Sequence, residues 1–224
     1  MYHFSYAQNI PPLIRKIYRF FFPSWTNYVQ KELAGCETVL DLGCGRGSNS
    51  PLEGMALTYT LGVDIFEPYL EECRQKKIHS DYIRADIRGI EFKDGSFDAV
   101  LMLEVLEHFT KEEGRRLLDK CSRWARRKVI ISTPNGYLWQ DGYDNNPFQE
   151  HKSGWSVEEL RSLGFSVVGC YGWKKLRGYK AIPRYRPRLL WEIISDVTQK
   201  VTYHYPASAS RLLAVQIVDK GHRV

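Results

Sequence analysis

A glycine-rich segment in the first quarter of the chain has the composition of a ligand-binding turn. It reads D-L-G-C-G-R-G-S-N over residues 41–49, with glycines at positions 43, 45 and 47, and it follows a short apolar run. Glycine lets the backbone turn sharply and lets a ligand approach without a Cβ atom in the way. In an open parallel sheet, ligands bind beyond the carboxyl ends of the strands. The segment therefore predicts a ligand site at the end of a strand.

The spacing of these glycines differs from that of the dinucleotide oxidoreductases. Their pattern, G-x-G-x-x-G, needs Gly or Ala at position 48, where this chain has Ser48. The spacing here is G-x-G-x-G, with an acidic residue, Asp41, two positions before the first glycine.

Two glutamates and two histidines form a second group that can do chemistry. Glu104, Glu107 and His108 are spaced i, i+3, i+4, which predicts one shared face of a helical turn, and the next histidine is His151. An imidazole or carboxylate can take a proton from a hydroxyl group. Two carboxylates with two imidazoles also suit Mn²⁺, Zn²⁺ or Mg²⁺. Three interpretations stay open: a metal site, a metal-free base at His108 or His151, and a structural role.

Aromatic residues accumulate after the predicted fifth strand. They are equally compatible with the lining of a substrate pocket and with the hydrophobic core. These residues are Tyr137, Trp139, Tyr143 and Trp155.

Alternating strands and helices are expected to position these groups. Short apolar runs ending in glycine or an acid predict buried strands, and capped segments with helical periodicity predict helices. The alternation predicts an α/β fold with a seven-stranded, mostly parallel, doubly wound sheet. The predicted strands are 38–43, 58–64, 81–86, 97–103, 129–132, 165–170 and 212–218. The predicted helices are 13–22, 24–35, 68–77, 111–125, 156–163 and 188–202.

The length of 224 residues suits one domain over 1–224, with an N-terminal helical segment at 1–35. An insertion, 171–210, separates the last two predicted strands, and such a long connection predicts a lid or docking surface.

The N-terminal segment 1–35 and the insertion 171–210 are both basic and aromatic. The first acidic residue is Glu32, and Tyr171–Arg188 contains seven Lys or Arg residues and no acid. Such surfaces meet acidic ligands, nucleic acid or anionic membranes, or are ordinary solvated charge.

The overall composition favours a globular cytoplasmic protein. Apolar residues make up 43% and charged residues 26%, which excludes disorder, and no apolar run reaches the length of a membrane span. The N-terminus lacks the features of a secretory signal. The five cysteines are odd in number and well separated, which predicts reduced thiols rather than a disulfide framework or a C-x-x-C zinc clip.

Four motifs in order resemble the class I S-adenosylmethionine-dependent methyltransferases, among them the methyltransferase type 11 group. The resemblance covers roughly residues 25–170 and the last strand. The motifs are D-L-G-C-G-R-G at 41–47, G-V-D-I at 62–65, A-D-I at 85–87 and F-D-A-V-L-M-L-E-V-L-E-H at 97–108.

The resemblance implies S-adenosylmethionine as cofactor and assigns a role to each motif. Asp64 would accept hydrogen bonds from the ribose hydroxyls, and Asp86 one from the adenine amino group. The Ile87 amide would donate to a ring nitrogen. Asp41 would orient the loop and the amino group of the donor. The other expected cofactor residues are Gly43, Cys44, Gly45 and Gly47 in the loop, with Ile65 and Leu103 on the two faces of the adenine.

Two subfamilies resemble the chain on the acceptor side. The ubiquinone-pathway O-methyltransferases have a similar E-x-x-E-H and a later histidine, which implies catalytic roles for Glu107, His108 and His151. The small-RNA terminal 2′-O-methyltransferases hold a divalent ion with residues that match Glu104, Glu107, His108 and His151.

The leading hypothesis is an O-methyltransferase for a small-molecule, sugar-linked or lipid-linked acceptor, with peripheral membrane contact through the basic segments. The alternative is an RNA 2′-O-methyltransferase with a Glu/His metal site. A non-catalytic binding protein is the third hypothesis, although it would require a damaged cofactor motif, and the motif here is intact.

Overall fold

The computed structural model describes residues 22–48, 50–178 and 182–218. The predicted helix 13–22 and most of the predicted N-terminal segment lie outside the described residues. The remaining chain forms a seven-stranded sheet in the order β3-β2-β1-β4-β5-β7-β6. All neighbouring strands are parallel except β7, which runs antiparallel to both β5 and β6. The predicted α/β architecture with a mostly parallel sheet is confirmed.

The elements alternate along the chain as the sequence predicts, with differences of a few residues at their ends. The strands are β1 Thr38–Leu42, β2 Tyr59–Asp64, β3 Asp81–Arg84, β4 Phe97–Leu103, β5 Ala125–Pro134, β6 Ser166–Trp173 and β7 Ala209–Ile217. The helices are α2 Trp25–Glu32, α3 Glu67–Gln75, α4 Lys111–Trp124, α5 Val157–Ser162 and α6 Arg188–His204.

Side-chain caps explain where several of these helices begin. The Ser156 hydroxyl accepts from the backbone N–H of Glu159, and the Glu159 side chain accepts from the backbone N–H of Ser156, which is the predicted capping box. Thr110 and Glu113 form the same box at α4. These caps fix the two helices that follow the strands nearest the candidate site.

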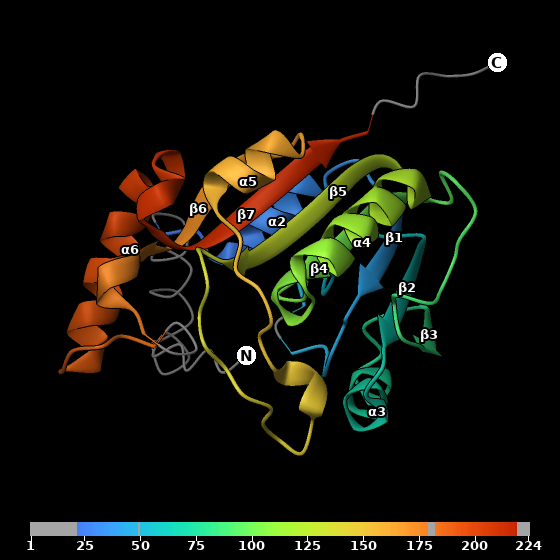
Figure 1. Ribbon diagram of the computed structural model, residues 1–224, viewed down its shortest axis with the longest axis horizontal. Coiled ribbons are helices and arrows are strands. Elements are labelled where there is room, and N and C mark those ends of the chain that lie inside the picture. Colours follow the sequence, from blue (N-terminus) through green and yellow to red (C-terminus); the bar gives the residue numbers. More distant parts are fainter. Residues whose placement is uncertain (1–21, 49, 179–181, 219–224) are drawn as a thin grey trace.

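Two apolar layers bury the sheet between the helices (Figure 1). One layer packs α4 and α5 against the sheet through residues such as Leu117, Trp124 and Leu160. The other packs α2 against the opposite face through Val29 and Leu33. Helix α6, within the predicted insertion, packs mainly against β6, the edge strand. Among the described residues, none of the helices combines the length and apolar character that crossing a membrane requires.

Candidate functional site

The glycine-rich loop follows β1 and adopts a conformation that only glycine accepts easily. Gly43, Gly45 and Gly47 all have positive φ angles, of 71°, 56° and 64°. A Cβ atom on Gly43 would lie 2.5 Å from a methyl carbon of Val105, whereas one on Gly45 would meet only a backbone oxygen at 4.0 Å. The loop is therefore tightly packed on one side and open around Gly45, where a ligand can approach the backbone.

Asp64, at the end of β2, holds this loop in place. Its Oδ2 accepts a hydrogen bond from the backbone N–H of Gly45 at 2.9 Å, and its Oδ1 accepts one from Phe66 at 2.8 Å. The side chain is buried, and this burial raises its pKa above the ordinary value. Each carboxylate oxygen keeps a second lone pair, so Asp64 can still accept from the ribose hydroxyls, as the resemblance implies.

Strand register brings the remaining predicted cofactor residues to the same edge. Leu42 of β1 pairs with Val63 of β2 and with Met102 of β4, so the loop, Asp64 and Leu103 all follow the same end of three adjacent strands. β1 lies between β2 and β4, where the strand order reverses, and such a switch point is the usual ligand site of open α/β sheets.

The segment after β3 is occupied by an ion pair. Arg88 donates to both oxygens of Asp86, from Nε to Oδ1 at 3.0 Å and from an Nη atom to Oδ2 at 2.6 Å, and this contact lowers the pKa of the Asp86 carboxyl. The same guanidinium reaches Glu113 of α4 at 2.8 Å. The Ile87 side chain is buried in the core, so the backbone amide is what Ile87 can offer a ligand. Ile65 and Leu103 are both partly exposed, as a contact with a ligand ring requires.

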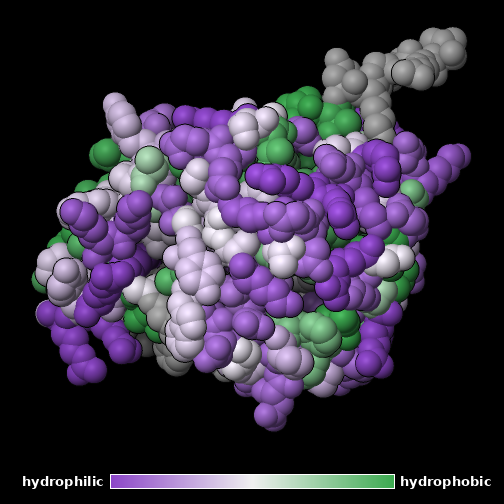
Figure 2. Space-filling view, viewed as in Figure 1, coloured by the Kyte–Doolittle hydropathy of each residue, from purple (hydrophilic) through white to green (hydrophobic). Residues whose placement is uncertain are grey.

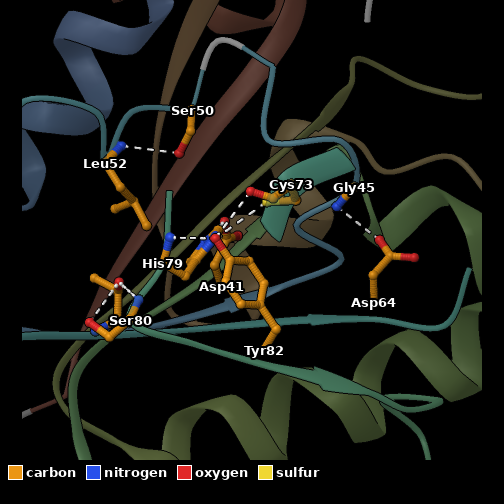
Figure 3. Close-up of polar contacts among 10 residues, drawn as sticks. Asp41, Gly45, Ser50, Leu52, Asp64, Cys73, His79, Ser80 and Tyr82 are labelled. Atoms are coloured by element: carbon orange, nitrogen blue, oxygen red, sulfur yellow. Dashed lines mark hydrogen bonds and ion pairs between the residues drawn. The ribbon is translucent and has the colours of Figure 1, made fainter. Parts of the chain in front are cut away.

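The sequence did not single out His79, yet it lies at the centre of a buried network (Figure 3). Its Nε2 is 3.0 Å from Oδ2 of Asp41, and its Nδ1 is 3.6 Å from Sγ of Cys73. Burial opposes protonation of His79, but the hydrogen bonds and charges of Asp41 and Cys73 together outweigh it and raise the pKa to about 9. Hydrogen bonds from Cys44 and His79 lower the pKa of the Cys73 thiol. Asp41 is thus tied to this histidine by its side chain.

The prediction that Glu104 shares a helical face with Glu107 and His108 is wrong. β4 ends at Leu103, Glu104 has a positive φ angle of 59°, and the following 3₁₀ turn, η2, covers only Leu106–His108. Glu104 thus lies before the helical turn and has a non-helical backbone conformation, so it does not share a helical face with the other two residues. Its carboxylate instead accepts from Ser132 of β5 at 2.9 Å and pairs with Arg211 of β7.

Glu107, His108 and His151 do converge, with one ligand atom of each within 4.8 Å of the others. Nδ1 of His108 lies 2.9 Å from the carbonyl oxygen of Glu150, and Nδ1 of His151 lies 2.6 Å from that of Leu138. Because a carbonyl oxygen only accepts, both Nδ1 atoms carry the hydrogen. Both Nε2 atoms therefore present a lone pair.

Burial sets the charge of this cluster. It lowers the pKa of His108 and lowers that of His151 to about 4, so both imidazoles are neutral near pH 7. It raises the pKa of Glu107, whose Oε2 has no hydrogen-bond partner among the described residues. A neutral imidazole can accept a proton or bind a metal ion.

The structure separates the aromatic residues that the sequence left ambiguous. Trp155 is fully buried, and its indole N–H donates to Ser153 at 3.1 Å, so it belongs to the core. Tyr137 and Trp139 are 61% and 63% exposed on the segment that leads to His151. These two remain available to contact an acceptor.

Comparison with known proteins identifies related sequences. Residues 40–132 match a family described as "Methyltransferase domain". A "probable S-adenosylmethionine-dependent methyltransferase" of Mycobacterium tuberculosis is 29% identical over 60% of this chain and 50% of its own length. A "probable tRNA methyltransferase 9B" of Mus musculus is 27% identical over 74% of this chain and 41% of its own length. A ubiquinone biosynthesis O-methyltransferase of Bordetella pertussis is 25% identical over 65% and 53%. The chain thus spans about half the length of the curated relatives it matches.

Solved structures share the fold. The crystal structure of the small RNA methyltransferase HEN1 superposes with a TM-score of 0.56 at 18% identity, over 88% of this chain and 25% of that one. At this level of identity the match concerns the arrangement of the sheet and helices.

Proposed function

The chain belongs to the class I S-adenosylmethionine-dependent methyltransferases, and on that premise we propose that it methylates an oxygen atom of a small-molecule, sugar-linked or lipid-linked acceptor. The observation that carries this proposal is the pair of neutral imidazoles, His108 and His151, whose Nδ1 atoms each bond a backbone carbonyl oxygen. The well-separated cysteines of the sequence are the basis for placing the enzyme in the cytoplasm, which is part of the proposal.

The cofactor side of the site suits S-adenosylmethionine, which supplies an electrophilic methyl group on a sulfonium sulfur. The open backbone around Gly45 fits the methionine part, and Asp64 offers oxygen acceptors for the ribose. Arg88, by pairing with Asp86, orients the carboxylate that is expected to accept from the adenine.

The acceptor side provides a base. During transfer the sulfur–carbon bond breaks, a carbon–oxygen bond forms, and the hydroxyl proton goes to Nε2 of one of the two imidazoles. The fixed Nδ1–H bonds to Glu150 and Leu138 stabilise that imidazolium and keep each ring oriented. Holding the acceptor in line with the methyl group supplies much of the remaining rate.

An exposed apolar stripe on α6 supports a lipid-linked acceptor and peripheral membrane contact. In Figure 2 the surface over α6 is mostly hydrophilic, and only scattered hydrophobic residues appear at its left margin. Arg184, Arg186 and Arg188 directly precede this stripe in the sequence, and anionic headgroups would neutralise their charge. The stripe consists of Leu189, Leu190, Ile193, Val197 and Val201, which are 41–59% exposed.

The metal-dependent RNA methyltransferase is the second candidate, because Glu107, His108 and His151 also suit a divalent ion. One ring nitrogen of each histidine and the unpartnered Glu107 oxygen would be the ligands of the ion. Such an ion would polarise the hydroxyl group of the acceptor. The pairing of Glu104 with Arg211 weighs against the four-ligand set that the resemblance implies. The probable tRNA methyltransferase 9B among the relatives of this chain favours an RNA acceptor.

One experiment separates the two candidates. Purified protein is incubated with methyl-labelled S-adenosylmethionine and a fractionated extract, with and without a chelator. Label in the lipid, glycan or small-molecule fraction that persists with chelator supports the leading proposal. Label in RNA that disappears with chelator supports the second candidate instead, and absence of any transfer contradicts both.

A further inference from the structure

Two thiols and an imidazole converge at the glycine-rich loop, separate from the acceptor side. Cys44 comes from the loop, Cys73 from α3, and His79 from the segment before β3. One ligand atom of each lies within 4.8 Å of the other two. Cys73 and His79 are buried, while Cys44 is partly exposed, so an ion can reach the group from the loop side.

The spacing of these atoms is that of a metal site. A tetrahedral Zn²⁺ ion with bonds of about 2.3 Å to sulfur and about 2.0 Å to nitrogen separates sulfur from nitrogen by about 3.5 Å. The measured distance between Sγ of Cys73 and Nδ1 of His79 is 3.6 Å. The two sulfurs also lie within 4.8 Å of each other. Little movement is needed to bring all three atoms to one ion.

The surroundings supply what a metal-binding histidine needs. Nε2 of His79 is held by Oδ2 of Asp41 at 3.0 Å, and a carboxylate in this position fixes the ring and makes the other nitrogen a better ligand. Two glycines leave room around the group. A Cβ atom on Gly62 would lie 3.0 Å from Nδ1 of His79, and one on Gly47 would lie 2.7 Å from Sγ of Cys73.

We propose that Cys44, Cys73 and His79 form a binding site for a soft divalent cation such as Zn²⁺, with Asp41 orienting the histidine and one coordination position left for a further ligand. Two thiolates and one imidazole select zinc over magnesium or calcium, which prefer oxygen. The ion ties the glycine-rich loop to α3. This site does not depend on the proposed function, because its test measures metal binding rather than methyl transfer.

The test uses the full chain, without a polyhistidine tag, stripped of metal, kept reduced and titrated with Co²⁺. Cobalt bound to thiolates absorbs by sulfur-to-cobalt charge transfer, and Glu107, His108 and His151 contain no sulfur that would give this signal. We expect one equivalent of Co²⁺ to produce the absorption and Zn²⁺ to displace it. The double variant Cys44→Ser with Cys73→Ser should abolish the absorption, and each single variant should lower its intensity and weaken binding. Asp41→Asn should keep the absorption and weaken binding about 10–100-fold.

Cys121→Ser is the matched control, because Cys121 is a buried thiol in α4 that donates to the sulfur of Met102, away from the cluster. It should leave the titration unchanged. Circular dichroism checks the fold of each variant. If Cys73→Ser unfolds, the titration of Cys44→Ser, at a partly exposed position, tests whether the thiols bind the metal. A folded wild-type protein without the charge-transfer absorption, or a Cys44→Ser variant with undiminished absorption and affinity, overturns the proposal.

Discussion

The carboxylate of Glu104 and the guanidinium of Arg211 form an ion pair between residues 107 positions apart in the sequence. Their side chains are only 13% and 6% exposed, and the Nε atom of Arg211 has no hydrogen-bond partner among the described residues. The pair joins the end of β4 to β7 beside the candidate active site. The positive charge of Arg211 also compensates the charge of Glu104, whose side chain is largely removed from solvent.

Replacing Arg211 alone should therefore be costly. Arg211→Met leaves the Glu104 carboxylate buried without its partner, and we expect the free energy of unfolding to fall by about 3–5 kcal/mol. Urea denaturation at pH 7 measures this. The double variant Glu104→Gln with Arg211→Met removes the unpaired charge and should recover part of the loss. A double variant no more stable than Arg211→Met would show that the charge is not the cause.

The imidazoles can be tested one at a time. We expect His151→Gln or His108→Gln to lower kcat by about 10²–10⁴-fold, because the base that takes the hydroxyl proton is lost. Steady-state kinetics gives kcat, and calorimetry should show unchanged binding of S-adenosylmethionine. His204→Gln, at an exposed position of α6, is the control and should behave as wild type. Full activity in both variants would rule out a histidine base.

Asp64 offers a test of the cofactor side. Asp64→Asn turns one acceptor oxygen into an amide group that faces the N–H of Gly45 or Phe66, so the loop loses a hydrogen bond. We expect Kd for S-adenosylmethionine to rise at least about tenfold, which corresponds to the loss of one hydrogen bond to a charged group. Asp81→Asn, at an exposed position of β3, should leave Kd unchanged. Equal affinities of Asp64→Asn and wild type would contradict the ribose role.

The carboxylate of Asp98 should make the free energy of unfolding depend on pH. Burial alone would raise its pKa, but the N–H groups of Glu37 and Thr38 at 2.9 and 3.1 Å, together with Arg126, lower the pKa below the ordinary value. A lowered folded-state pKa gives stability that is present above the unfolded pKa of about 3.9 and is lost as the pH falls through the folded value.

The corresponding variant is Asp98→Asn. At pH 7 we expect it to lower the free energy of unfolding by about 1–3 kcal/mol, since charge-assisted hydrogen bonds are lost. Urea titrations from pH 7 down to pH 3 should show the gap to wild type narrowing below pH 4. A gap that is constant over this range would show that ionisation of Asp98 does not stabilise the fold.

The cofactor half of the site could be predicted because its signals are local. The loop glycines, Asp64 and Asp86 each follow a strand within a few residues, so strand prediction alone places them at one edge. The sequence predicts the start of β5 at residue 129, four residues too late. Arg126, Arg127 and Lys128 interrupt the apolar pattern, yet the strand extends through them.

The rest depends on contacts between distant segments. His79 meets Asp41 across 38 positions, and Arg211 meets Glu104 across 107, so no short window contains either pair. The error at Glu104 arose because helical spacing was assumed where the backbone makes a positive φ turn. That His151 approaches His108 follows from the loop after β5, whose path the sequence pattern does not specify.

The position of β7 has a consequence for synthesis on the ribosome. Among the described residues β7 follows β6 in the sequence, yet it lies between β5 and β6, and β6 forms its ladder with β7 alone. As the chain emerges, β1 to β5 can assemble in order, whereas β6 must stay unpaired until β7 has been synthesised. Arg211 lies on β7 as well. The nascent chain therefore exposes an unpaired sheet edge, and Glu104 lacks its ion-pair partner, until β7 has left the ribosome.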